Sequence, residues 1–185
     1  MSERNPAEAV ETYRQLLQRL LSCVTDRIMT VSSVDRSSPY LPGDYPHLLA
    51  LSEGRPTPLT GAGPLVLRVA YRYEIIEVDG QRRLWEVHTR GYMLALSMRG
   101  QMSQEEIVAY HWHPAGGGSI TIPHLHVGSA IAGTSLQIGE RYAHRLHFPT
   151  GSVPLSLVIR MAIEEFGVHP LRDDWREVLT QEQAS

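Results

Sequence analysis

Apolar residues near both ends of the chain recur at helical spacing and predict two amphipathic helices. The first begins at Asn5-Pro6, a good N-cap and first-turn pair, and runs to about Thr25. The second begins near Pro154 and ends at Gly167, a residue suited to the C-terminal end of a helix. A short last helix follows, capped by Asp173 or Asp174. The apolar faces of the two longer helices consist of Val10, Tyr13, Leu16, Leu17, Leu20, Leu21 and Val24, and of Leu155, Val158, Ile159, Ala162, Ile163 and Phe166.

Between these helices the pattern changes to the alternation of apolar and polar residues that is typical of strands with one buried face. Residues 65–78 form the clearest strand, and Asp79-Gly80 predicts a two-residue hairpin turn. The return strand covers about Arg82 to Met98, with a bulge or bend at Gly91. Two more strands, Glu106–His113 and Ser119–Gly128, complete a meander. Residues 28–34 indicate a short strand, whereas residues 37–64 are rich in Pro and Gly and predict a long loop.

The expected fold class is therefore α+β. An antiparallel meander sheet of about four strands is packed by an N-terminal helix and C-terminal helices, and residues 1–185 form a single domain. The sequence has no apolar run long enough for a membrane span and no apolar leader, so no membrane contact and a cytoplasmic location are expected. The lone Cys23 agrees with a reducing compartment. All 17 basic residues are arginine, and the net charge of −3 argues against nonspecific coating of nucleic acid.

Two His-x-His pairs stand out as the candidate chemistry: His111-Trp-His113 and His124-Leu-His126. Residues two apart on a strand point to the same face, so each pair places two imidazoles side by side. The segment between them, residues 114–123, contains three consecutive glycines and can turn the chain back. A hairpin in which His113 faces His124 and His111 faces His126 would put all four rings on one face.

Three interpretations of this face remain open. Neutral imidazole is a common metal ligand, so His111, His113, His124 and His126 would hold a divalent metal such as zinc. Alternatively, the histidines would act as acid and base without a metal, for example in RNA cleavage, with Arg145 holding a phosphate and His147 at the edge of the site. In the third interpretation they form a polar sheet face that hydrogen-bonds to loop backbone and has no chemical role.

Three motifs carry a resemblance to known proteins: Tyr110-His-Trp-His-Pro114, Pro123-His-Leu-His-Val-Gly128 and His147-Phe-Pro-Thr-Gly151, followed by a helix that ends in Glu164-Glu-Phe-Gly-Val168. With these motifs the chain resembles an uncharacterised bacterial family of hypothetical proteins. More distantly, it is similar to TumE-type toxins of toxin–antitoxin modules, which share a Tyr/His-rich strand, a Pro-His-x-His segment and a closing helix. The resemblance implies an antitoxin-like partner protein and an RNA substrate.

Two hypotheses of function follow from these observations. In the first, the chain is a small histidine-dependent nuclease-like or hydrolytic enzyme, of the toxin type, with His111, His113, His124, His126, Arg145 and His147 at its site. In the second, it is a non-catalytic binding module whose histidine face has a structural role or meets a partner. The sequence alone does not choose between an enzyme and a binding module.

Overall fold

The computed structural model describes residues 2–33, 38–61, 63–99, 104–114, 120–128, 137–138, 141–142 and 146–181. Within these residues three α-helices form, close to where the apolar periodicity predicts them. They are α1 (Pro6–Leu21), α3 (Leu155–Glu164) and α4 (Trp175–Gln181), and a short 3-10 helix, η1 (Ser52–Gly54), adds one turn. The Asn5 side chain accepts a hydrogen bond from the Ala7 N–H, so the predicted N-cap is confirmed. Gly167 has a φ of 70°, which confirms its place just beyond the end of α3.

The sheet is larger than the four-stranded meander that the sequence predicts. Among the described residues it is antiparallel and has eight strands, in the order β1-β2-β4-β5-β6-β7-β10, with β3 paired to β4 beside this path. The strands are β1 (Met29–Ser33), β2 (Gly43–Leu51), β3 (Thr57–Pro58), β4 (Leu65–Asp79), β5 (Leu84–Arg99), β6 (Gln104–Trp112), β7 (His124–Val127) and β10 (Phe148–Pro149). A separate two-stranded sheet joins β8 (Gln137–Ile138) to β9 (Arg141–Tyr142). The class is α+β as expected, but the strand number was wrong.

Two of the strands that the sequence does not predict, β2 and β3, lie in residues 37–64, where a long loop is expected. Strand β2 pairs with β4 from Gly43 to Ala50 and with β1 along its second half. Its register is broken between Gly43 and His47, so the strand carries an irregularity instead of a clean alternation. The apolar segment Leu48–Leu51 forms the regular part of β2. Its backbone hydrogen bonds are made with the neighbouring strands β1 and β4, and the local sequence does not indicate this pairing.

The long hairpin of β4 and β5 confirms the turn at Asp79 but not its length. The ladder closes with Asp79 opposite Leu84, so four residues form the connection instead of two. The Asp79 carboxylate accepts hydrogen bonds from the N–H groups of Gln81 and Arg82, which stabilises this longer turn. The predicted bulge is also present, since the register shifts where Gly91 faces Arg72.

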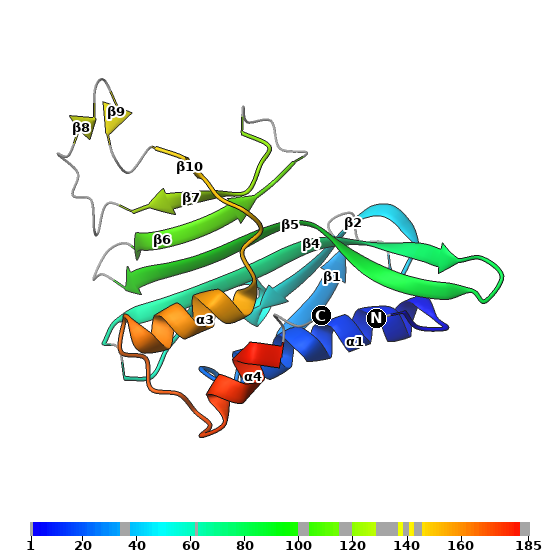
Figure 1. Cartoon of the computed structure of the whole chain (residues 1–185), viewed down its shortest axis with the longest axis horizontal. Coiled ribbons are helices and arrows are strands. Elements are labelled where there is room, and N and C mark those ends of the chain that lie inside the picture. Colours follow the sequence, from blue (N-terminus) through cyan, green and yellow to red (C-terminus); the bar gives the residue numbers. More distant parts are fainter. Residues whose placement is uncertain are drawn as a thin grey trace.

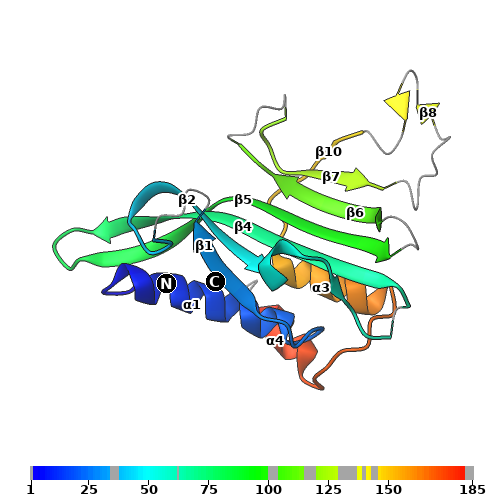
Figure 2. The same cartoon turned by 180° about the vertical axis from the view of Figure 1, so that it is seen from behind.

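The helices α1, α3 and α4 lie on one side of the sheet, where α4 packs against α1 and α3 (Figures 1 and 2). The core forms between them, and its largest fully buried side chains include Leu17 and Leu20 of α1, Leu67 and Leu94 of the sheet and Ile159 of α3. On β6 the core includes Ile107, next to an irregularity in the ladder with β5, and from there on the residues that pack toward it are Val108, Tyr110 and Trp112. None of the helices in the described residues is long and apolar enough to cross a membrane.

The alternation along β6 therefore sends Ala109 and His111 to the other face of the sheet, away from the helices. No helix of the described part of the chain covers that face (Figures 1 and 2). The histidine motifs of β6 and β7 lie there, at the end of the sheet where β10 adds a short edge.

Candidate metal centre

The two His-x-His pairs share one face, but their register differs from the prediction. His111 lies opposite His124, and His126 lies opposite Ala109, so the hairpin is shifted by two residues. His113 lies beyond the end of the ladder. Pro114 and Pro123 flank the connection and have no N–H to donate, which is why the ladder stops short of His113. Because a shift of two residues preserves the face, the four imidazoles still converge.

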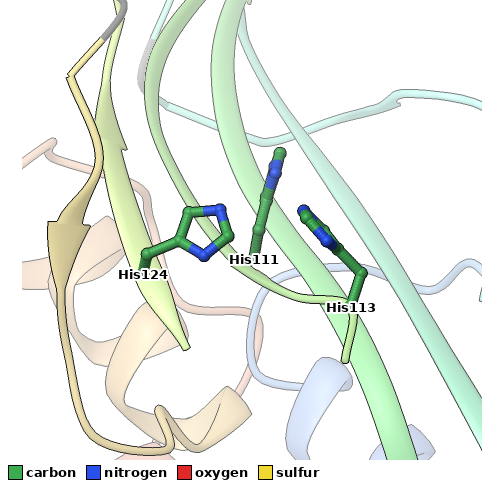
Figure 3. A group of neighbouring side chains, drawn as sticks. All are labelled: His111, His113 and His124. Atoms are coloured by element: carbon green, nitrogen blue, oxygen red, sulfur yellow. The ribbon is translucent and has the colours of Figure 1, made fainter. Parts of the chain in front are cut away.

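A fifth imidazole joins them. His147, which immediately precedes β10, lies with its ring centroid 4.3 Å from that of His126 and 5.1 Å from that of His124. His124 is the centre of the cluster, since its ring is within 5.8 Å of the other four. His113 occupies the opposite end, 5.1 Å from His124 and 6.2 Å from His111. Figure 3 shows the side chains of His111, His113 and His124 on one side of β6 and β7, with their rings near one another.

Two trios of ring nitrogens are close enough together to hold a metal ion. One is His111, His113 and His124, and the other is His124, His126 and His147. In each trio the nitrogens lie within 4.8 Å of one another. The first trio is the more buried, because His147 is exposed whereas His111 and His113 are partly covered and His124 is fully buried.

The structure thus brings together five of the six predicted site residues. His147 was expected at the edge of the site as an acid–base residue, and its position also makes it a possible ligand. The sixth, Arg145, lies outside the described residues, so its prediction stays a prediction.

The hydrogen bonds of His124 define which of its nitrogens can bind a metal. Its Nδ1 lies 2.8 Å from the Ile122 carbonyl oxygen. A carbonyl only accepts, so Nδ1 carries the proton and Nε2 presents a lone pair. This backbone bond to the second nitrogen is the usual way in which a protein orients a metal-binding histidine.

Two of the cluster's nitrogens are buried without a hydrogen-bond partner. They are Nε2 of His111 and Nε2 of His124, and no described residue bonds to either. Buried polar atoms are nearly always satisfied in native proteins, so each exception requires an explanation such as a bound ion or water.

The electrostatics of the cluster favour neutral rings. Burial lowers the pKa of His111 to about 4, and the other imidazoles, His126 first among them, add to the effect. Burial likewise lowers the pKa of His126 to about 4, with His147 as the next contributor. Both rings are therefore neutral at pH 7, which is the protonation state that binds a metal ion.

Sequence reasoning missed Arg72. This arginine of β4 lines a pocket of about 270 Å³ that also borders His111 and His113. The signal that could have found it is the register of the β4–β5 hairpin, which places Arg72 opposite Gly91, so that only strand β5 separates Arg72 from the histidine strand β6.

Comparison with known proteins finds no family model, no curated protein and no solved structure that matches the chain. The resemblance to TumE-type toxins, with its antitoxin-like partner and RNA substrate, accordingly stays a prediction.

Proposed function

We propose that the chain binds one divalent transition-metal ion through His111, His113 and His124 and uses it for hydrolytic chemistry. The observation that carries this proposal is the pair of buried Nε2 atoms, on His111 and His124, that have no hydrogen-bond partner among the described residues. Both atoms belong to the more buried trio, and a metal ion coordinated there would satisfy both at once.

Binding of one ion, and not two, follows from the sharing of His124. Its Nδ1 is held by the Ile122 carbonyl, so a single nitrogen remains for the two trios. The trios are therefore alternatives. The deeper one contains both unsatisfied nitrogens, whereas the other depends on the exposed His147.

The donor set limits the metal and suggests the chemistry. Neutral imidazoles suit Zn²⁺, Cu²⁺, Ni²⁺ and Fe²⁺, and they are poor ligands for Mg²⁺ and Ca²⁺. A zinc ion held by three protein ligands retains an open position for water and lowers the pKa of that water to about 7. This arrangement supports hydrolysis as the class of reaction.

The two other interpretations of the histidine face explain less. Acid–base catalysis without a metal needs one protonated histidine near pH 7, and the lowered pKa values of His111 and His126 remove these two rings from that role. A purely structural face accounts for the bond from His124 to Ile122, yet it leaves the Nε2 atoms of His111 and His124 without a role.

A titration with Co²⁺, a spectroscopic substitute for Zn²⁺, tests the proposal. The purified protein is first stripped with a chelator and then titrated at pH 7.5 while the visible absorption of Co²⁺ is recorded. We expect saturation at one equivalent with an intense band typical of four-coordinate cobalt.

The matched variants are His124→Ala and His88→Ala. His88 lies on β5 outside the cluster, has a half-exposed side chain and lies 3.7 Å from Glu86. His124→Ala should abolish the band, and His88→Ala should leave it unchanged. A wild-type protein that gives no band, or a His124→Ala protein that keeps it, would overturn the proposal.

A further inference from the structure

The face that carries the histidines has a pocket beside them, which Arg72, His111 and His113 line. Gly91 of β5 lies between Arg72 on β4 and His113 at the end of β6. A side chain there would lie only 2.7 Å from the Trp112 carbonyl oxygen, and its Cβ would be 3.8 Å from the Cα of His113. The two strands therefore approach closely at Gly91, where a Cβ would meet backbone, and the pocket itself is defined by the side chains around it, among them Arg72, His111 and His113.

Arg72 supplies a positive charge at the wall of this pocket. Its side chain is exposed, and no carboxylate of the described residues is ion-paired with it, whereas the neighbouring Glu74 is paired with Arg90 at 3.1 Å. An arginine guanidinium binds phosphate or carboxylate through two parallel hydrogen bonds. Two strand spacings, roughly 10 Å, separate the backbone of Arg72 from that of His113. An oxyanion between them can therefore contact both side chains.

The rest of the pocket wall is apolar. Leu48, Ala70 and Met93 line it, with Met93 directly opposite His111 and the other two on β2 and β4. Its volume of about 270 Å³ lies just below the usual range for ligand pockets and admits a substituent of about the size of a phenyl ring.

We infer that this pocket binds the substrate of the metal centre, and that the substrate is a small oxyanion with an apolar substituent. Arg72 holds the oxyanion beside the ion at His111 and His113, and Leu48, Ala70 and Met93 contact the substituent. The inference rests on the proposed function, since it places the substrate at that same ion. A long polar chain would not be a substrate under this inference, and Arg72 is a substrate-binding residue.

Isothermal titration calorimetry tests this inference with three probes: phenyl phosphate, benzoate and inorganic phosphate. Each is titrated into Co²⁺-loaded protein at pH 7.5. We expect phenyl phosphate or benzoate to bind, and the tighter of the two identifies the oxyanion as phosphate or carboxylate. Phenyl phosphate should bind more tightly than inorganic phosphate because of the apolar wall. Equal binding of these two phosphates would overturn the apolar part of the inference.

Variants at Arg72 separate charge from geometry. Arg72→Gln should weaken binding of the preferred probe by about 10- to 100-fold, the usual effect of losing a charged hydrogen-bond pair. Arg72→Lys should retain part of the affinity for the probe, because lysine keeps the positive charge but cannot form the two parallel hydrogen bonds. The control is Arg82→Gln, which removes the same charge at the exposed tip of the β4–β5 hairpin and should bind like wild type.

A Co²⁺ titration of each protein distinguishes a failure of the substrate pocket from a failure of the metal centre. Arg72→Gln should bind Co²⁺ as wild type does. If wild type binds Co²⁺ but neither organic probe, or if Arg72→Gln binds the probes as tightly as wild type, the inference about the pocket is wrong and the metal centre stands. If wild type fails to bind Co²⁺, the proposed function is wrong, and with it the placement of the substrate beside an ion.

Discussion

The metal-free protein should lose stability in mild acid because His111 resists protonation in the folded state. Its pKa falls from 6.5 to about 4 on burial among the other imidazoles. In the unfolded chain the same ring titrates near 6.5, so the unfolded state binds more protons between these two values. The free energy of unfolding is therefore fully present above pH 6.5 and decreases as the pH falls toward 4.

The magnitude follows from the size of the pKa shift. One pKa unit corresponds to about 1.4 kcal/mol, so His111 alone should remove about 2 kcal/mol of stability by pH 5 and about 3 kcal/mol by pH 4. His126 should contribute in the same direction, but less, because its ring is less buried and part of its pKa shift comes from mutual repulsion with its neighbours.

Urea unfolding of wild type and of His111→Gln, in the presence of a chelator, measures this effect between pH 7.5 and 5. The difference between the two proteins isolates His111, because groups such as Glu106, whose pKa is raised by burial, titrate in both. We expect the wild type to lose about 2 kcal/mol more than His111→Gln over this range. His88→Gln serves as the control and should follow the wild type. Parallel curves for wild type and His111→Gln would refute the idea that the cluster depresses this pKa.

Four further predictions concern the core, the metal and the cell. Leu20→Ala should lower the free energy of unfolding by about 2–5 kcal/mol, because Leu20 is 1% exposed, and an unchanged urea midpoint would mean that α1 is peripheral. Zn²⁺ at about a hundredfold excess over its Kd should stabilise wild type by about 3 kcal/mol in thermal or urea unfolding, and it should have no effect on His124→Ala. In a Zn²⁺ competition assay, His113→Ala should weaken binding at least tenfold and His147→Ala less; the reverse order would assign the ion to the exposed trio. If the chain is a toxin, its induced expression should slow growth and His124→Ala should restore it, whereas equal growth with and without wild-type expression would remove the toxin hypothesis.

Periodic apolar patterns made the helices and the central hairpin predictable from sequence. Both depend on local signals: the Asn5 cap, the regular alternation of residues 65–78 and the bulge at Gly91. Strand β2 depends on pairing with β1 and β4, and an irregular register interrupts it. A strand whose backbone bonds are satisfied by distant neighbours has little local signature, which is why the sequence of residues 37–64 predicts a loop.

For the histidine site, too, the sequence predicts the features that depend on local spacing and misses those that depend on tertiary structure. The spacing of two residues guaranteed that each His pair shares a face, and that part of the prediction is confirmed. The exact partners depended on where the ladder ends, which Pro114 and Pro123 decide, so the predicted register was wrong by two residues. The place of Arg72 beside the histidines depends on the pairing of β4 with β5 and of β5 with β6, which the pattern within a single strand does not indicate.

Anomalous diffraction at the zinc absorption edge, from crystals grown with Zn²⁺, would locate the bound ion. We expect one strong peak per chain, at about 2.0–2.1 Å from a ring nitrogen of each of His111, His113 and His124. On His111 and His124 the contacting atom should be Nε2, the nitrogen that is buried without a partner among the described residues. A peak held by His124, His126 and His147 without His111, or a cluster with no peak, would contradict this expectation.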